Sequence, residues 1–224
     1  MGSFMITAAV IPARNEAKRI RSVVEQTRLH VDYVVIVDDG SNDGTADMIN
    51  DLGETVVVLQ HDVNLGKGAA LKTGCDAALL LKADVIVTLD ADGQHNPASI
   101  PGMIKQLQDD KLDIVFGMRQ FNSKMPMMML IGNQFLSKLI SFLFKVMIHD
   151  TQSGYRVFTA HAYKDLRWHS TGYEAETEMI VRTGDHHLHY AEFDIATIYH
   201  DNYKGTTVFD GIKILLQILR WKFI

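Results

Sequence analysis

The sequence predicts an α/β fold with a mostly parallel central sheet flanked by helices. Short apolar runs that end in turn or acidic residues alternate with longer segments of helical period, which is typical of repeated βα units. No uninterrupted apolar stretch reaches the length of about 18 residues that a transmembrane helix needs, so none is expected. No Gly/Ser-rich linker divides the pattern, and we therefore expect a single domain over residues 1–224.

The apolar runs place the strands and the segments of helical period place the helices, in alternation along the first half. Strands are expected at residues 6–11, 33–37, 55–59, 85–89 and 113–116. Helices are expected near residues 16–29, 45–52, 67–82 and 97–109. Beyond Gly117 the pattern changes to an apolar helix, a strand at 153–158, a helix from Glu174 and a strand near 190–198. The second half is expected to give this single domain its particular function.

Composition excludes several classes of protein. With 22 Lys and Arg against 27 Asp and Glu, the formal charge is −5, so no basic excess is present to attract nucleic acid. The single cysteine, Cys75, has no intrachain partner for a disulfide, which favours a reducing, intracellular compartment. The first ten residues lack the basic start of a signal peptide, and residues 1–3 have the look of a cloning remnant.

Acidic side chains follow two of the predicted strands. Asp38 and Asp39 follow the second strand, and Asp90 and Asp92 follow the fourth. Ligands of open α/β sheets bind beyond the carboxyl ends of the strands. Carboxylates this close together raise one another's pKa unless a cation compensates their charge. Asp90, Asp92 and Gln94 offer oxygen ligands that suit Mg²⁺ or Mn²⁺. The alternative is that the two aspartates only end a strand and cap the next helix.

The segment around Lys67 is similar to a phosphate-binding loop. A Walker A motif would need glycine and serine or threonine where His61 and Gly68 stand, so a P-loop NTPase is excluded. The dinucleotide fingerprint is also missing after the first strand. Lys67 either attracts a phosphate at a helix start or is a solvated lysine.

Glu174 and Glu178 share one helical face, which points either into a cleft or to solvent.

Four segments follow one another along the chain: Ile-Pro-Ala-Arg-Asn-Glu at 11–16, Val-Asp-Asp-Gly-Ser-Asn-Asp-Gly-Thr at 37–45, Asn-Leu-Gly-Lys-Gly-Ala-Ala at 64–70 and Asp-Ala-Asp-Gly-Gln-His at 90–95. In this order they resemble a family 2 glycosyltransferase with the GT-A-type nucleotide-binding fold. Three later segments, at 117–119, 150–156 and 173–178, narrow the resemblance to the dolichyl-phosphate mannosyltransferase-like branch, which glycosylates polyprenyl phosphates. The resemblance spans residues 6–218.

The resemblance implies a set of site residues. Those implied to bind the nucleotide-sugar donor are Pro12, Arg14, Glu16, Val37, Asp39, Asp90, Ala91, Asp92, Gln94, Arg119 and Lys204. Those implied to hold the metal ion are Asp90, Asp92 and Gln94. The catalytic candidates are Asp90, Asp92, Arg119 and Asp150.

The role of Asp150 depends on the acceptor. A lipid phosphate has a second pKa near 6 and arrives largely ionised at neutral pH, so it needs no strong general base. A sugar hydroxyl would need one, and Asp150 is then the candidate. The alternative for Asp150 is a turn residue before Ser153 and Gly154.

Two apolar segments are expected to contact a membrane surface. Residues 127–148 form a possible interface helix whose polar side chains occupy one narrow stripe, and residues 209–224 form an amphipathic segment ending in Arg-Trp-Lys-Phe. A helix buried in the core, or self-association at the terminus, is the alternative.

The resemblance, together with the acidic pairs and the two apolar segments, implies a metal-dependent, inverting transfer of a sugar from a GDP- or UDP-sugar to a polyprenyl phosphate, by a protein peripheral at the cytoplasmic membrane face. Two alternatives stay open: transfer to a saccharide or protein hydroxyl, and a non-catalytic nucleotide-binding module at the membrane surface.

Overall fold

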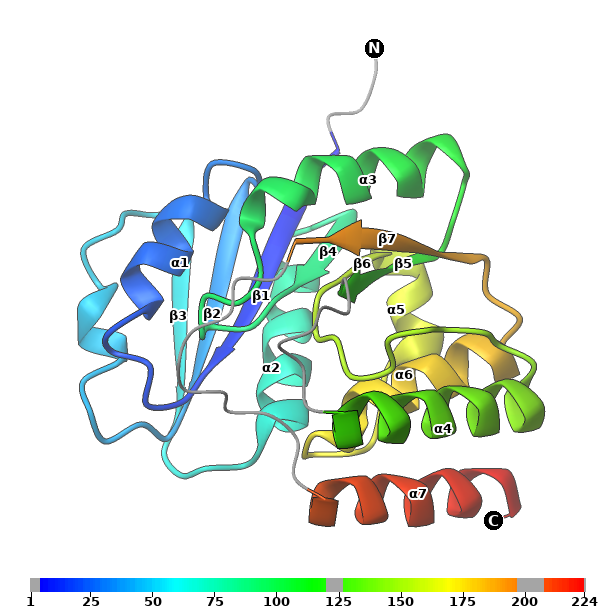
Figure 1. The fold of residues 1–224 in the computed structure, drawn as a ribbon. Helices are drawn as coiled ribbons and strands as arrows, with labels where there is room; N and C mark the ends of the chain where they lie inside the picture. Colours follow the sequence, from blue (N-terminus) through cyan, green and yellow to red (C-terminus); the bar gives the residue numbers. More distant parts are fainter. Residues whose placement is uncertain (1–4, 120–126, 197–207, 224) are drawn as a thin grey trace.

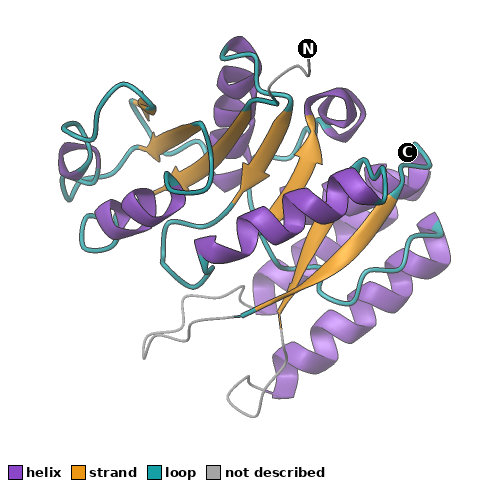
Figure 2. Cartoon of the chain, turned by 90° about the horizontal axis from the view of Figure 1, so that it is seen from above, coloured by secondary structure: helices purple, strands orange, loops and turns teal. Residues whose placement is uncertain are grey.

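The computed structural model describes residues 5–119, 127–196 and 208–223. The described residues form one sheet with helices on both faces, as Figures 1 and 2 show. The strands are β1 (Thr7–Ala13), β2 (Tyr33–Asp39), β3 (Val56–His61), β4 (Val85–Thr88), β5 (Ile114–Arg119), β6 (Arg156–Thr159) and β7 (Tyr190–Ile195). Their spatial order is β3-β2-β1-β4-β6-β5-β7. The predicted α/β class is confirmed.

The helices form two unequal layers (Figure 1). They are α1 (Ile20–Thr27), α2 (Lys67–Leu80), α3 (Ile100–Asp109), α4 (Met127–Phe144), α5 (Ala160–Leu166), α6 (Glu174–Asp185) and α7 (Val208–Phe223). Helices α1 and α3 pack on one face of the sheet, and the others lie on the opposite side. Among the helices of the described residues, none combines the length and the apolar character needed to cross a bilayer.

Strand direction brings the sheet's functional ends together. Neighbours β3, β2, β1 and β4 pair in parallel, and β5 pairs in parallel with β7. Only β6 among the described strands is antiparallel, to both β4 and β5. The carboxyl ends of the six parallel strands and the start of β6 therefore lie along one edge, which we call the carboxyl rim.

The alternation of side chains along each strand explains the two cores. Val10 and Val35 pack under α2, whereas their neighbours Ile11 and Ile36 pack under α1 and α3. All four are fully buried, because helices cover both faces of the sheet. Strands buried on both faces are apolar throughout, which is why the sequence shows continuous apolar runs instead of an alternating pattern.

Three predicted helices differ from the structure. The apolar helix expected at 127–148 ends at Phe144, and the next residue, Lys145, takes a positive φ of 57°. The helix expected at 45–52 is a single 3-10 turn, η1 (Ala46–Met48), because the Thr45 hydroxyl bonds to Asp43 and accepts a hydrogen bond from the backbone of Glu16. Such side-chain bonds to nearby groups compete with helix formation. The helix expected from residue 16 begins only at Ile20, after Asn15 takes a positive φ of 55°. Helix α5 was not predicted.

Candidate functional site

The first wall of the site joins the loop after β1 to the loop after β2. The backbone N–H of Asn15 donates to the Ser41 hydroxyl at 2.9 Å, and the Asn15 side chain accepts from the backbone of Asn42 at 2.9 Å. The backbone N–H of Glu16 donates to Thr45 Oγ1, also at 2.9 Å. These bonds hold two of the four resembling segments, 11–16 and 37–45, against each other.

Asp39 ties the end of β2 to the turn before α2. Its carboxylate accepts hydrogen bonds from the backbone N–H groups of Leu65 and Gly66, each at 2.8 Å, and lies 2.8 Å from His61 Nδ1. Gly66 has a φ of +99°, and a side chain there would meet the Thr171 carbonyl oxygen at 2.4 Å. Asp39 is buried and organises this turn, so its binding to a nucleotide stays a prediction.

The paired carboxylates stand in the loop after β4. Asp92 accepts hydrogen bonds from the Gln94 backbone at 3.0 Å and the Gln94 side chain at 2.8 Å. The Asp90 backbone N–H donates to Nδ1 of buried His95 at 3.2 Å, and the His95 ring stacks on Tyr155. The loop after β4 is thus held by the hydrogen bonds of Gln94 to Asp92 and by the hydrogen bond of the Asp90 backbone to His95.

The two carboxylates differ in charge environment. Burial opposes ionisation of Asp90, but the Lys67 ammonium together with His95 and Arg119 outweighs it and holds the pKa of Asp90 at about 2. Burial and the Asp90 charge raise the pKa of Asp92 above its ordinary value. Asp92 is the less compensated carboxylate, which is the condition that favours a bound cation.

Lys67 lies between two carboxylates from distant parts of the chain. Its Nζ is 2.6 Å from Asp90 Oδ1 and 2.5 Å from Glu176 Oε1 on the first turn of α6. Burial lowers the pKa of Lys67, yet the two carboxylates more than offset this and raise it. The side chain is only 19% exposed, so the interpretation as a solvated lysine is wrong.

Arg119, at the end of β5, is clamped by Asp150. Arg119 Nε lies 2.7 Å from Asp150 Oδ2 and Nη2 lies 2.9 Å from Oδ1, which is a two-pronged charged pair. The Arg119 backbone N–H also donates to Oδ2, at 3.2 Å, and the Gln152 backbone donates to Oδ1, at 3.2 Å. Asp150 therefore uses both oxygens to orient Arg119 toward the carboxyl rim.

A second arginine, Arg156, lies beneath the rim at the start of β6. It is 1% exposed, its Nε donates to the Ser153 carbonyl at 3.3 Å, and its guanidinium lies 5.1 Å from the centre of the Phe116 ring. Among the described residues, its Nη1 and Nη2 have no hydrogen-bond partner. Burial lowers the pKa of Arg156 to about 10, although Glu176 and Asp150 act in the opposite direction.

The donor set fits a hard divalent cation. Within the described part of the chain, no group of three His, Cys, Asp or Glu side chains could hold a metal ion. Asp90, Asp92 and the Gln94 amide nevertheless stand on one loop. Mg²⁺ commonly binds through one or two carboxylates and completes its shell with substrate phosphates and water. Asp90 and Asp92, with Gln94 beside them, are therefore the residues that would hold the ion.

Not every implied donor-binding residue presents its side chain at the rim. The side chain of Val37 is buried under α2 and that of Ala91 on the opposite face of the sheet. Arg14 is exposed, Pro12 is partly buried, and Lys204 lies outside the described residues. Glu178, expected at a cleft or in solvent, is 2% exposed and instead accepts hydrogen bonds from Ser170.

Three participants in this arrangement were not assigned a role from the sequence. Glu176 holds Lys67, His95 supports Asp90, and Arg156 lies among the acidic groups. The signal in the sequence that could have found them is that each lies in a segment that resembles the family: His95 in 90–95, Arg156 in 150–156 and Glu176 in 173–178.

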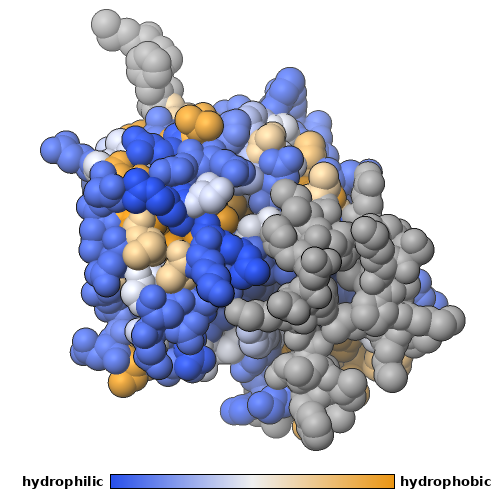
Figure 3. All heavy atoms as spheres, turned by 60° about the vertical axis from the view of Figure 1, so that its left-hand side comes forward, coloured by the Kyte–Doolittle hydropathy of each residue, from blue (hydrophilic) through white to orange (hydrophobic). Residues whose placement is uncertain are grey.

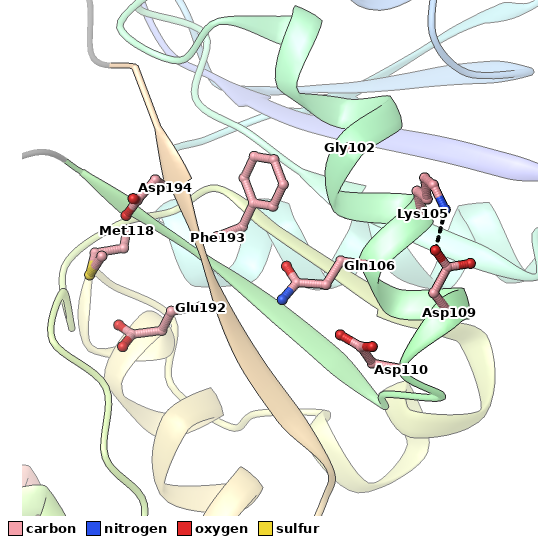
Figure 4. A pocket seen from close by; sticks show the side chains of 9 residues that line it. All are labelled: Gly102, Lys105, Gln106, Asp109, Asp110, Met118, Glu192, Phe193 and Asp194. Carbon is pink, nitrogen blue, oxygen red and sulfur yellow. Dashed lines mark hydrogen bonds and ion pairs between the residues drawn. The ribbon is translucent and has the colours of Figure 1, made fainter.

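A separate hollow lies between α3 and the edge strand β7 (Figure 4). Four of its nine lining residues are acidic, and Lys105 pairs there with Asp109. None of the implied site residues lines it. The chemistry predicted from the sequence therefore does not concern this hollow.

Comparison with known proteins identifies the family. The model of "Glycosyl transferase family 2" matches residues 8–166. The UDP-N-acetylglucosamine–dolichyl-phosphate N-acetylglucosaminyltransferase of Methanococcus voltae is 35% identical over 237 residues, covering 95% of this chain and 94% of that protein. The polyprenol monophosphomannose synthase of Mycolicibacterium smegmatis is 29% identical over 162 residues, covering 68% of this chain and 61% of that protein.

A solved structure supports the fold. Glucosyl-3-phosphoglycerate synthase from Mycobacterium tuberculosis, crystallised with Mn²⁺, UDP and glucosyl-3-phosphoglycerate, matches with a TM-score of 0.74 at 20% identity, covering 96% of this chain and 80% of that chain. At this identity the likeness concerns the fold, and it confirms the GT-A type. The family match over most of the chain, together with the relative at 35% identity, shows that the chain belongs to glycosyl transferase family 2 and is a glycosyltransferase.

Proposed function

We propose that the chain transfers a sugar, with inversion, from a nucleotide-sugar donor to a polyprenyl phosphate at the cytoplasmic membrane face. The observation that carries this proposal is the charge pattern of the carboxyl rim. Asp90 and Asp92 stand there beside the cations Lys67 and Arg119, both of which lower the pKa of Asp90. Such a mixture suits a diphosphate, which needs cations around its oxygens and acids to hold a metal ion.

A UDP-sugar is the donor that we favour over a GDP-sugar. The relative from Methanococcus voltae is named for UDP-N-acetylglucosamine, and the matching solved structure contains UDP and Mn²⁺. A bound Mg²⁺ or Mn²⁺ would act as a Lewis acid on the departing diphosphate. Asp90, Asp92 and Gln94 would hold that ion, while the interlocked loops at 11–16 and 37–45 form the wall available to the nucleoside.

Arg119 is the proposed contact for the acceptor phosphate. The phosphate is already ionised at neutral pH, so the site has to orient it more than deprotonate it. Asp150 supports this role, because both of its oxygens are engaged by Arg119 and neighbouring backbone groups. A carboxylate with its lone pairs used in this way is poorly placed to accept a proton from a hydroxyl acceptor.

Helices α4 and α7 form the proposed membrane-facing surface. They lie side by side (Figures 1 and 2), and Lys222 of α7 is 5.2 Å from the Phe144 ring of α4. Their buried sides carry residues such as Leu136 and Ile218, so part of each apolar stripe belongs to the core. The outer sides expose the apolar residues Phe135, Phe142, Leu216, Leu219 and Phe223 and the cations Lys138, Lys213, Arg220 and Lys222, and the exposed Lys145 follows directly after α4.

This combination suits the interface of a bilayer, where apolar side chains insert and cations meet anionic headgroups. The face formed around α1 and β3 is different: it is largely hydrophilic, with apolar residues in small groups among the polar ones (Figure 3). Small apolar groups are ordinary for a water-exposed surface. The α4–α7 side is therefore the face that we propose meets the membrane, which would bring a lipid-borne phosphate to the protein.

The test supplies labelled UDP-N-acetylglucosamine, UDP-glucose or GDP-mannose with Mn²⁺ and a short polyprenyl phosphate, and measures label in the organic phase. We expect transfer from at least one donor, loss of transfer in excess EDTA, and loss in Asp92→Asn. Asp109→Asn removes an exposed carboxylate from α3 and is the matched control. Full activity of Asp92→Asn in EDTA would refute the metal-dependent mechanism.

A further inference from the structure

Lys67 lies against the carboxylate of Asp90, one of the proposed metal ligands. Its ammonium is 2.6 Å from Asp90 Oδ1, which is a short charged hydrogen bond. Lys67 is the first residue of α2, and the 2.5 Å contact to Glu176 Oε1 draws it toward α6, 109 positions further along the chain. One positive charge is thus shared by two carboxylates.

The backbone of Gly154 makes room for this meeting. A Cβ atom at position 154 would lie 3.0 Å from Asp90 Oδ1, 3.0 Å from Glu176 Oε1 and 3.1 Å from Lys67 Nζ. The Gly154 carbonyl also accepts a hydrogen bond from the Thr88 hydroxyl at 2.9 Å, which fixes the glycine beside the end of β4. The glycine, the two acids and the lysine therefore form one compact unit.

We propose that Lys67 is an internal cation that competes with the metal ion for Asp90, and that Glu176 is the carboxylate that retains Lys67 when the metal displaces it. The inference rests on the metal site of the proposed function and adds a residue that sets how tightly that site binds. Lys67 is a positioning residue in this account.

The physical argument concerns two cations and one oxygen. A divalent ion on Asp90 Oδ1 would stand a few ångströms from the Lys67 ammonium, and two positive charges repel each other strongly at such a distance. The Lys67 ammonium must therefore move away from Asp90 when the metal ion binds. It can do so and still keep its ion pair with Glu176. Metal affinity is then reduced by the free energy of breaking the contact between Lys67 and Asp90.

The experiment measures Mn²⁺ binding directly, by the loss of the free-ion electron paramagnetic resonance signal, without donor or acceptor. Lys67→Met keeps the chain length and removes the charge, so we expect it to bind Mn²⁺ about 10- to 100-fold more tightly than the unmodified protein, the equivalent of one charged hydrogen bond. Lys105→Met removes another paired lysine from an exposed site and should change the affinity by less than about twofold.

A second measurement does not depend on the variant's folding. In the unmodified protein, NMR signals of the Lys67 side chain should shift as diamagnetic Mg²⁺ is added, whereas those of Lys105 should stay unchanged. Tighter binding by Lys67→Met together with this shift supports the proposal. Equal affinity of Lys67→Met and the unmodified protein, or an unmoved Lys67 signal at saturating Mg²⁺, overturns it. If Asp92→Asn binds Mn²⁺ as the unmodified protein does, the metal site fails, and the proposal fails with it.

Discussion

Replacing Asp150 by asparagine tests whether that residue orients Arg119 or acts as a base. The Asp150 side chain is fully buried and that of Arg119 is 13% exposed, so the variant removes the carboxylate charge that a nearly buried guanidinium contacts through two nitrogens. Removing one partner of a buried ion pair costs about 3–5 kcal/mol. We take the lower end, about 3 kcal/mol, because the asparagine can still accept one of the hydrogen bonds and the guanidinium reaches the rim.

The assay for this variant has two parts. Urea unfolding should show the loss of stability, and Asp113→Asn, a partly exposed carboxylate remote from the site, should change stability by much less. The value of kcat/KM from pH 5.5 to 8.5 should fall by a similar factor at every pH, because a misplaced Arg119 is charged throughout this range. Arg119→Ala should lose about one to two decades in rate, the value of one charged hydrogen bond.

A different outcome would refute this reasoning. If Asp150→Asn is as stable as the unmodified protein, the pair with Arg119 does not hold the site together. If the unmodified protein's rate climbs through a single carboxylate pKa and the variant loses that climb, Asp150 is a base, and a hydroxyl acceptor is then indicated.

Two further variants probe the loop behind the site and the proposed membrane surface. Burial would raise the pKa of Glu178, but hydrogen bonds from Ser170, the His169 backbone and Arg182 lower it. The ionised side chain therefore stabilises the folded state above about pH 4.5, and this stabilisation is lost as the pH falls through the lowered pKa of the folded state. Urea unfolding of Glu178→Gln should therefore show a deficit of about 1.5–3 kcal/mol at pH 7 that shrinks toward pH 3, and a deficit independent of pH would contradict the assignment. Phe142 is 85% exposed on α4 and should insert into the bilayer, so Phe142→Glu should weaken vesicle binding in a flotation assay. Leu80→Glu, at an 81% exposed position on α2, is the control and should leave binding unchanged. Equal flotation of the two variants would show that α4 is not part of the membrane-binding surface.

Local sequence signals predicted most of the strands and their order along the chain, because the strands are buried on both faces and appear as apolar runs. They did not predict that β6 inserts antiparallel between β4 and β5, since this pairing joins Thr88 to Arg156, and no local pattern encodes a partner that far away. The predicted helix at 45–52 failed for a related reason: the Thr45 hydroxyl bonds outside its own segment, to Glu16.

The candidate site divides in the same way. Asp90, Asp92 and Gln94 stand on one loop, so their spacing suggested a shared metal site, but it fitted a strand end followed by a helix cap equally well, and the resemblance favoured the metal site. The Lys67 and Glu176 pair could not be predicted, because it depends on how α2 and α6 pack and on the space above Gly154. The clamp of Asp150 on Arg119 likewise forms only when the segment before β6 folds back beside the end of β5.

The central claim is that the acceptor is a phosphate, and one competition experiment tests it most directly. Equal amounts of a polyprenyl phosphate and the polyprenol of the same length are offered with one labelled nucleotide sugar and Mn²⁺, and the products are separated by their charge. We predict that the label enters only the anionic, phosphate-linked product and that EDTA prevents its formation. Label in the neutral product at a comparable rate would contradict the account, because a site that orients an ionised phosphate through Arg119 has no means of activating an alcohol.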